Sequence, residues 1–177
     1  MSYPYLMATL PPLNFSEPAP LNLEELLELA SPVLNETDRD SLHRLLGGED
    51  VPVRVVTQYR DFQRSLDHEL VLQRSILLGQ VVNRDVRLFE DAPVALAHEI
   101  MQAHNPREAQ QVRWYGLWSK LKQLNLGQLM NQADFFVYLL EWQLLLEKQV
   151  FKVQEGRQKL FGLVSHMLET SCEEVVP

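Results

Sequence analysis

Apolar residues recur every three to four positions along most of this chain, which is the period of an α-helix with one buried face. The clearest case is the helix predicted from about residue 53 to about residue 83. At about 100° per residue, one arc of this helix holds its apolar side chains: Tyr59, Phe62, Leu66, Leu70, Leu77 and Val81. A second arc, about 110° away, holds Arg60, Arg64 and Arg74. The pattern predicts one face for a core and one face with three guanidinium groups.

The same period predicts six or seven helices, and no segment alternates convincingly as a strand, so we expect an all-α helical bundle. The predicted helices follow each other at residues 21–30, 37–46, 53–83, 91–104, 106–125, 129–154 and 155–169. Five prolines within residues 1–20 preclude a long helix there. We expect an irregular start with a short strand or helical turn at residues 5–10.

Local signals mark two of the helix starts. Thr37 and Asp40 have the spacing of a capping box, although aspartate takes the place of the usual glutamate. Asn105 followed by Pro106 predicts an N-cap and a first helical residue. We therefore expect helices to begin at these two positions.

The helix at residues 129–154 is apolar on two sides. One side begins with Leu129, and the only polar side is a narrow stripe of four residues, Asp134, Glu141, Lys148 and Lys152. We expect this helix to be central and largely covered, with the polar stripe in solvent. In the preceding helix an aromatic group is formed by Trp114, Tyr115 and Trp118, and we expect it to be core rather than interface.

Length and composition are those of a globular protein with one core or two small helical lobes, at 177 residues and 46% hydrophobic residues. We expect one helical domain over residues 1–177, or an acidic lobe at 1–50 beside a main bundle at 51–177. The single Cys172 rules out a disulfide within the chain and suits a reducing cytosol.

The net charge of −8 is concentrated at the two ends of the chain. Residues 1–50 hold nine acidic residues and only two basic ones, whereas residues 51–168 are nearly neutral. Binding to nucleic acid generally needs a net basic surface, so we expect no nucleic-acid partner. The most apolar stretch, residues 135–146, is well short of the ~20 residues that span a bilayer, and no signal-peptide pattern opens the chain. We expect a cytoplasmic protein with no membrane-inserted segment.

Common catalytic motifs are missing from the sequence. His98 and His104 are six residues apart, whereas paired zinc ligands on one helix are four apart. No phosphate-binding loop, dinucleotide fingerprint or nucleophile elbow occurs. We expect no enzyme activity, no cofactor and no metal site.

The candidate partner-binding residues are Arg60, Arg64 and Arg74. Arg74 lies between Val71 and Leu78 on its own face, and a guanidinium group in an apolar patch needs a carboxylate. That carboxylate belongs either to this chain or to a partner. We favour an internal role for Arg74, with Arg60 and Arg64 more exposed and available for contact.

Four segments along the chain have recognisable patterns: YPYLMATLPPLNF, YRDFQRSLDHELVLQRSILLG, NPREAQQVRWYGLWSKL and ADFFVYLLEWQLLLEKQVFKVQEGRQKLFGLV. Together they resemble a bacterial family whose genes accompany those of V/A-type ATPases, and which is itself similar to the C (or d) subunit of these rotary ATPases. In the second segment Ser75 stands where the family usually has alanine. Each motif is weak alone, and the order of all four along most of the chain carries the resemblance.

The resemblance implies a non-catalytic helical subunit or assembly factor. The C-type subunit is a funnel of helices that rests on the membrane rotor ring and receives the foot of the central stalk. The implied partners are therefore central-stalk and rotor-ring subunits, and the implied location is the cytoplasm, peripheral to the inner membrane through the ATPase. This chain is shorter than that subunit, so it would hold only part of the funnel.

Two other function classes remain open on the sequence. An independent helical adaptor would bind a partner helix or peptide in a large exposed apolar groove. A helical enzyme with a scattered site would need a deep pocket lined by converging charged groups.

Overall fold

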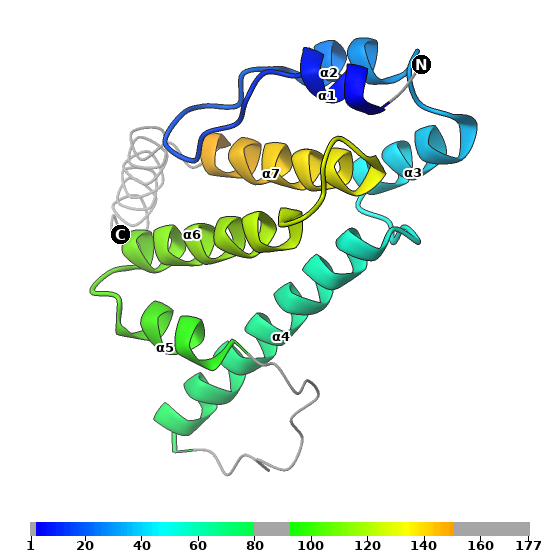
Figure 1. Ribbon diagram of the computed structural model, residues 1–177. Helices are drawn as coiled ribbons and strands as arrows, with labels where there is room; N and C mark the ends of the chain where they lie inside the picture. Colours follow the sequence, from blue (N-terminus) through cyan, green and yellow to red (C-terminus); the bar gives the residue numbers. More distant parts are fainter. Residues whose placement is uncertain (1–2, 80–92, 151–177) are drawn as a thin grey trace, which may run out of the picture.

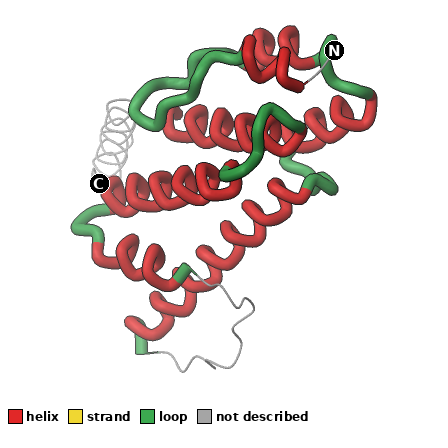
Figure 2. Tube along the Cα trace, viewed as in Figure 1, coloured by secondary structure: helices red, strands yellow, loops and turns green. Residues whose placement is uncertain are grey.

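The computed structural model describes residues 3–79 and 93–150 of the chain. Within these ranges it contains seven α-helices and no strand, so the predicted all-α fold is confirmed (Figures 1 and 2). The helices are α1 (Tyr3–Thr9), α2 (Leu23–Ala30), α3 (Glu36–Leu46), α4 (Arg54–Leu77), α5 (Val94–Gln102), α6 (Pro106–Asn125) and α7 (Gln132–Val150). The helix predicted at residues 155–169 lies outside the described residues.

Helix α7 forms the centre of the fold and packs on α1, α4 and α6. Buried residues occupy all of its sides: Phe135, Phe136, Val137, Tyr138, Leu139, Leu140, Glu141, Trp142, Leu144 and Leu145. Polar tips of two aromatic residues reach the N-terminal segment. Tyr138 donates to the Pro11 carbonyl at 3.1 Å, and Trp142 Nε1 donates to the Leu21 carbonyl at 2.9 Å. The prediction of a central, covered helix is confirmed.

The described part of the chain opens with the short helix α1, so the strand-like alternative for residues 5–10 is wrong. Pro4 fits because a proline in the first helical turn sacrifices no intrahelical hydrogen bond. The Tyr3 hydroxyl donates to the Asp38 carboxylate, which also accepts from Gln132 Nε2 and from Asn35 Nδ2. Asp38 is itself buried. One carboxylate thus joins α1, α3 and the start of α7.

Side-chain caps set the ends of several helices. Asn105 caps α6 as predicted, because its side chain accepts from the Glu108 amide at 2.9 Å. The capping box expected at Thr37 is wrong: the N-cap of α3 is Asn35, which accepts from the Asp38 amide at 2.8 Å. Asn35 has an extended backbone, whereas Thr37 already lies inside the helix.

Helix α4 runs from the α3 side of the molecule to its far end, where it lies beside α5 (Figure 1). It ends at Leu77, earlier than predicted, because Gly79 takes a left-handed conformation with φ +71°. Tyr59, Leu66 and Leu70 are buried as expected. Leu77 is 74% exposed, so its assignment to the core is wrong. Val81 lies outside the described residues.

The aromatic group on α6 divides between core and surface. Trp114 and Trp118 are buried, which confirms them as core. Tyr115 is exposed, which contradicts the expectation, and its ring meets the edge of Phe15 with centroids 5.7 Å apart. The predicted core position therefore holds for the two tryptophans and is wrong for Tyr115.

Candidate functional site

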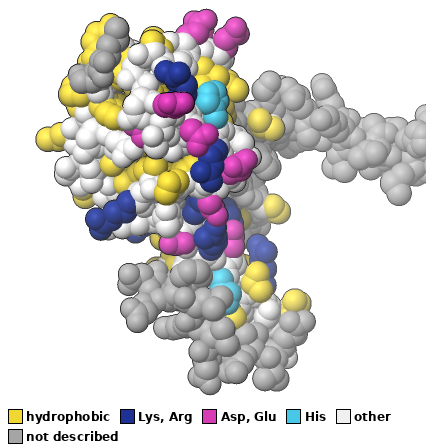
Figure 3. All heavy atoms as spheres, turned by 90° about the vertical axis from the view of Figure 1, so that its right-hand side faces the viewer, with side chains coloured by type: hydrophobic (Ala, Val, Ile, Leu, Met, Phe, Trp, Pro, Cys, Tyr) yellow, Lys and Arg dark blue, Asp and Glu magenta, His cyan; other side chains and the backbone are white. Residues whose placement is uncertain are grey.

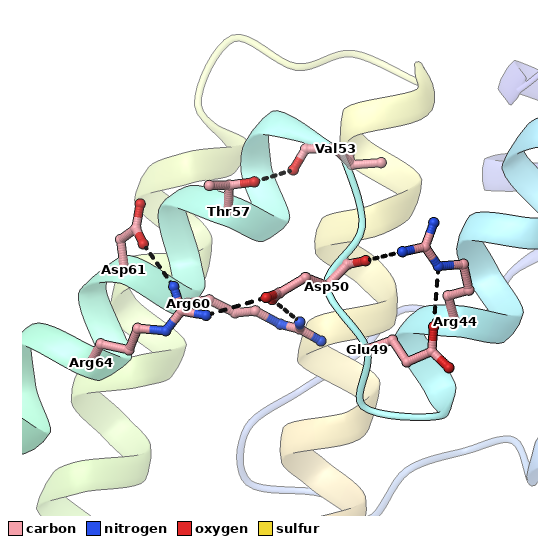
Figure 4. Close-up of polar contacts among 8 residues, drawn as sticks. All are labelled: Arg44, Glu49, Asp50, Val53, Thr57, Arg60, Asp61 and Arg64. Carbon is pink, nitrogen blue, oxygen red and sulfur yellow. Dashed lines mark hydrogen bonds and ion pairs between the residues drawn. The ribbon is translucent and has the colours of Figure 1, made fainter.

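The three predicted contact residues of α4 divide into two arginines with ion pairs and one, Arg74, with no ion pair to any described residue. Arg60 Nη1 pairs with Asp50 Oδ1, and Arg64 Nη2 lies 3.5 Å from Asp50 Oδ2 (Figure 4). Arg64 Nη1 also lies 3.3 Å from Asp61 Oδ1, within the same helix. The Arg60 side chain is only 18% exposed. Two of the three predicted contact residues therefore already have carboxylate partners within the chain.

Asp50 stands at the junction between α3 and α4, in the segment that connects them. Its carboxylate faces the α4 arginines, while its carbonyl accepts from Arg44 Nη2 of α3 at 2.7 Å (Figure 4). Arg44 Nε also pairs with Glu49 at 3.2 Å. The hydrogen bond from Arg60 is the main cause that lowers the pKa of Asp50. The cluster links the end of α3, the α3–α4 connection and α4 through ion pairs within the chain.

Charges of both signs alternate over the face of the molecule that Figure 3 turns to the viewer. Lys and Arg side chains are interspersed there with Asp and Glu, and no separate basic face stands out. Elsewhere on α4, Asp67 pairs with Arg113 of α6 at 2.6 Å. The basic face predicted for α4 is thus interrupted by carboxylates: Asp50 of the preceding connection, and Asp61 and Asp67 of α4 itself.

Arg74 is exposed and forms no ion pair with any of the described residues. The internal role favoured for it is therefore not what the structure shows. The physical reason is that the apolar residues around it, Val71, Leu77 and Leu78, are themselves exposed. Of the three predicted contact residues, Arg74 is the one with no carboxylate partner among the described residues.

A surface that the sequence analysis missed is the connection between α6 and α7. It exposes Leu126 at 78%, Leu129 at 85% and Met130 at 49%. Leu129 was expected on the core face of a helix, which is wrong because α7 begins only at Gln132. The sequence signal was Gly127 in a run of apolar residues between two helices. We name Leu126, Leu129 and Met130 the apolar connection.

Hydrogen bonds hold the apolar connection in one shape. The Asp134 carboxylate accepts from the Met130 amide at 2.9 Å, and the Asn131 side chain accepts from the Asp134 amide at 3.0 Å. Met130 takes a left-handed backbone with φ 51°, which is uncommon for a residue other than glycine. Such a conformation persists where surrounding contacts determine it. The three apolar side chains are therefore presented on an ordered backbone.

Comparison of the chain with protein-family models, with curated proteins and with solved structures found no match. The resemblance to the family encoded with V/A-type ATPases therefore rests on the four sequence segments alone.

The described helices include none with the length and apolar character needed to cross a bilayer. Groups of three or more potential metal ligands are likewise missing from residues 3–79 and 93–150. A polar hollow of about 220 Å³ lies between α3, α4 and α7 and includes Tyr59, Arg60 and Glu147 in its lining. Arg60 is paired with Asp50, and Glu147 accepts from Trp114 Nε1 at 3.2 Å. The charged groups of this hollow are thus already engaged.

Helix α7 also holds a buried carboxylate that the sequence placed in solvent. Glu141 is 4% exposed, and Lys122 Nζ of α6 donates to its Oε2 at 2.9 Å. Burial is the largest influence and raises the pKa of Glu141, while the contact with Lys122 opposes that rise. The predicted solvent stripe is therefore wrong at Glu141, because α6 covers that side of α7.

Proposed function

We propose that the chain is a non-catalytic helical subunit or assembly factor of a V/A-type ATPase, a C-like link between the central stalk and the membrane rotor ring. Its partners are central-stalk and rotor-ring subunits, and it lies on the cytoplasmic side, peripheral to the inner membrane through that complex. Support comes from the ordered resemblance of four segments and from an all-helical fold. In this role the chain transmits force or assists assembly through shape rather than chemistry.

The observation that carries the proposal is the apolar connection between α6 and α7. Three large apolar side chains stand in solvent on a backbone fixed by the Asn131 and Asp134 hydrogen bonds. Exposed apolar side chains that gather on one ordered segment provide a surface for contact with another protein. Full burial of one such side chain is worth about 1.5–3 kcal/mol. An ordered backbone also reduces the entropy lost on binding.

Copurification with a matched pair of variants tests the proposal. A tagged chain is recovered from native membranes after mild solubilisation, and the ATPase subunits that accompany it are identified by mass spectrometry. Leu129→Asp places a charge on the apolar connection and should abolish copurification. Leu77→Asp makes the same change at a similarly exposed leucine on α4 and should retain it. Wild-type chain that never accompanies the ATPase would end the proposal.

A second candidate, an independent helical adaptor, is favoured by a groove over α5 and α6. Its volume is about 500 Å³, and its lining includes Phe15, Leu96, Val112 and Tyr115. A partner helix with apolar residues at helical spacing would fit a groove of this composition. The adaptor function would be favoured over the ATPase role if the chain copurifies with one other protein and no ATPase subunits. In that case Tyr115→Asp should abolish copurification of that protein, and Leu129→Asp should not.

A further inference from the structure

The end of α4 presents a cation among exposed apolar side chains. Val71, Arg74 and Leu78 follow one another at i, i+3 and i+7, so they lie on one side of the helix, and Leu77 lies next to Arg74. Leu77 and Leu78 are about three-quarters exposed, at 74% and 75%. We name these four residues the α4 end. A partner surface that combines apolar contacts with a carboxylate would match it, because the carboxylate would pair with Arg74 when the contact removes it from water.

Such a surface exists on α2 of the same sequence. Leu23 and Leu27 are four residues apart and share a face, and Glu24 and Glu28 lie beside them at the same spacing. Together with Ser31, these residues line a shallow groove of about 530 Å³. Leu23 is exposed, and both glutamates are exposed with no ion pair to any described residue. The groove therefore offers apolar contacts together with carboxylates that no described cation pairs with.

We propose that the α4 end of one copy of the chain docks in the α2 groove of a second copy. Arg74 pairs with Glu28, and Val71, Leu77 and Leu78 cover Leu23 and Leu27. Within one copy the two surfaces cannot meet, because α2 lies at the opposite end of the molecule from the last turn of α4 (Figure 1). The two complementary surfaces can therefore contact each other only between two copies of the chain.

A contact between two different surfaces has a defined consequence for assembly. After two copies have joined, one α4 end and one α2 groove remain unoccupied, so further copies can bind. The products are a closed ring or an open linear oligomer. Both surfaces are small, which places the contact among weak interfaces. We expect a mass that rises with concentration and passes twice the mass of one chain.

Sedimentation equilibrium of the full chain tests this, over about 1 μM to about 1 mM, the range in which weak contacts populate. Wild-type chain should associate with concentration. Arg74→Glu and Glu28→Lys should each weaken association at least about tenfold, because each sets like charges opposite one another. Glu28 lies in the last turn of α2, where a lysine also suits the helix dipole, so the variant keeps its helix.

Charge exchange makes the test specific. The double variant Arg74→Glu/Glu28→Lys should recover wild-type association, and so should a mixture of the two single variants. Arg107→Glu, a reversal at an exposed arginine of α6, serves as the matched control and should associate like the wild type. Wild-type chain that stays monomeric throughout, an unchanged Arg74→Glu variant, or a double variant that fails to recover would each overturn the proposal.

The inference is independent of the proposed ATPase role, because it uses the α4 end rather than the apolar connection. Copurification with the ATPase should therefore survive Arg74→Glu, and self-association should survive Leu129→Asp. The failure of one proposal leaves the other standing, and the two variants distinguish them.

Discussion

Lys122 is the cation on which the buried Glu141 depends. Its Nζ donates to Glu141 Oε2 at 2.9 Å and lies equally near Oε1, which accepts no hydrogen bond of its own. The side chain of Glu141 is 5% exposed, whereas that of Lys122 is 49% exposed. Replacement of Lys122 by methionine keeps much of the aliphatic stem and removes the charge. It leaves a buried carboxylate with no cation.

We expect Lys122→Met to lower the free energy of unfolding at pH 7 by about 3 kcal/mol, the low end of the range for breaking a buried pair. The low end applies because Lys122 itself is half exposed and regains water when the pair is lost. A loss of this size changes the folding equilibrium constant by roughly a hundredfold. Lys120→Met is the matched control, since Lys120 lies over the Phe62 ring and faces no buried carboxylate.

The dependence on pH follows from the direction of the Glu141 pKa. Burial raises that pKa, so ionised Glu141 is less favourable in the folded chain than in the unfolded one. This penalty is absent below the ordinary glutamate pKa of about 4.3 and grows as the pH rises through the raised folded value. Loss of Lys122 raises the folded pKa further. The cost of Lys122→Met should therefore be large at pH 7 and small at about pH 3.5.

Urea unfolding followed by tryptophan fluorescence measures this at both pH values. Addition of Glu141→Gln to Lys122→Met should recover most of the lost stability, because a neutral amide replaces the unpaired charge. The reasoning is refuted if Lys122→Met matches Lys120→Met at pH 7, or if its cost is the same at both pH values.

Three further predictions concern the fold. Asp38→Asn should lower the free energy of unfolding by about 2 kcal/mol, because Tyr3 and Gln132 then donate to an amide that is itself partly a donor. An unchanged midpoint of urea unfolding would contradict a structural role for Asp38. Phe136→Ala should lower the free energy of unfolding by about 4 kcal/mol, because it opens a cavity at a fully buried site, and calorimetry can measure this loss. A loss under 1 kcal/mol would show that neighbouring side chains fill the cavity. Asp50 has a lowered pKa, so its ion pairs add stability above the ordinary aspartate range that is lost as the pH falls through the lowered value. Asp50→Asn should therefore flatten the acid and salt dependence of the unfolding midpoint, and equal dependence in variant and wild type would argue against the cluster.

The sequence-based prediction of the fold rested on the helical period of apolar residues and on helix-capping residues. The position of α6 followed from Asn105 and Pro106, whose cap geometry is local and needs no knowledge of neighbours. The central place of α7 followed from its apolar residues on two sides. The cap of α6 and the apolar pattern of α7 both depend only on residues near each other in the sequence, so the sequence alone predicts them.

The errors arose where neighbouring helices decide the outcome. Glu141 is buried because α6 covers its side of α7, and Leu77 is exposed because it lies in the last turn of α4, where that helix reaches the far end of the molecule. Arg60 and Arg64 were expected to be free, but Asp50 turns toward them from the preceding connection. Arg74 was expected to be internal because apolar residues surround it, and those residues are themselves exposed. In each case the exposure or pairing of the side chain depends on how the helices and their connections pack, and the periodicity of one helix does not contain that information.

The proposed contact between the rotary ATPase and the apolar connection of α6 and α7 can be detected by cross-linking in native membranes. A photo-activatable residue in place of Leu129 should give a covalent product with a central-stalk or rotor-ring subunit. The same residue in place of Leu77 should give none. Cross-links from position 129 that reach only proteins outside the ATPase, or none at all, would contradict it.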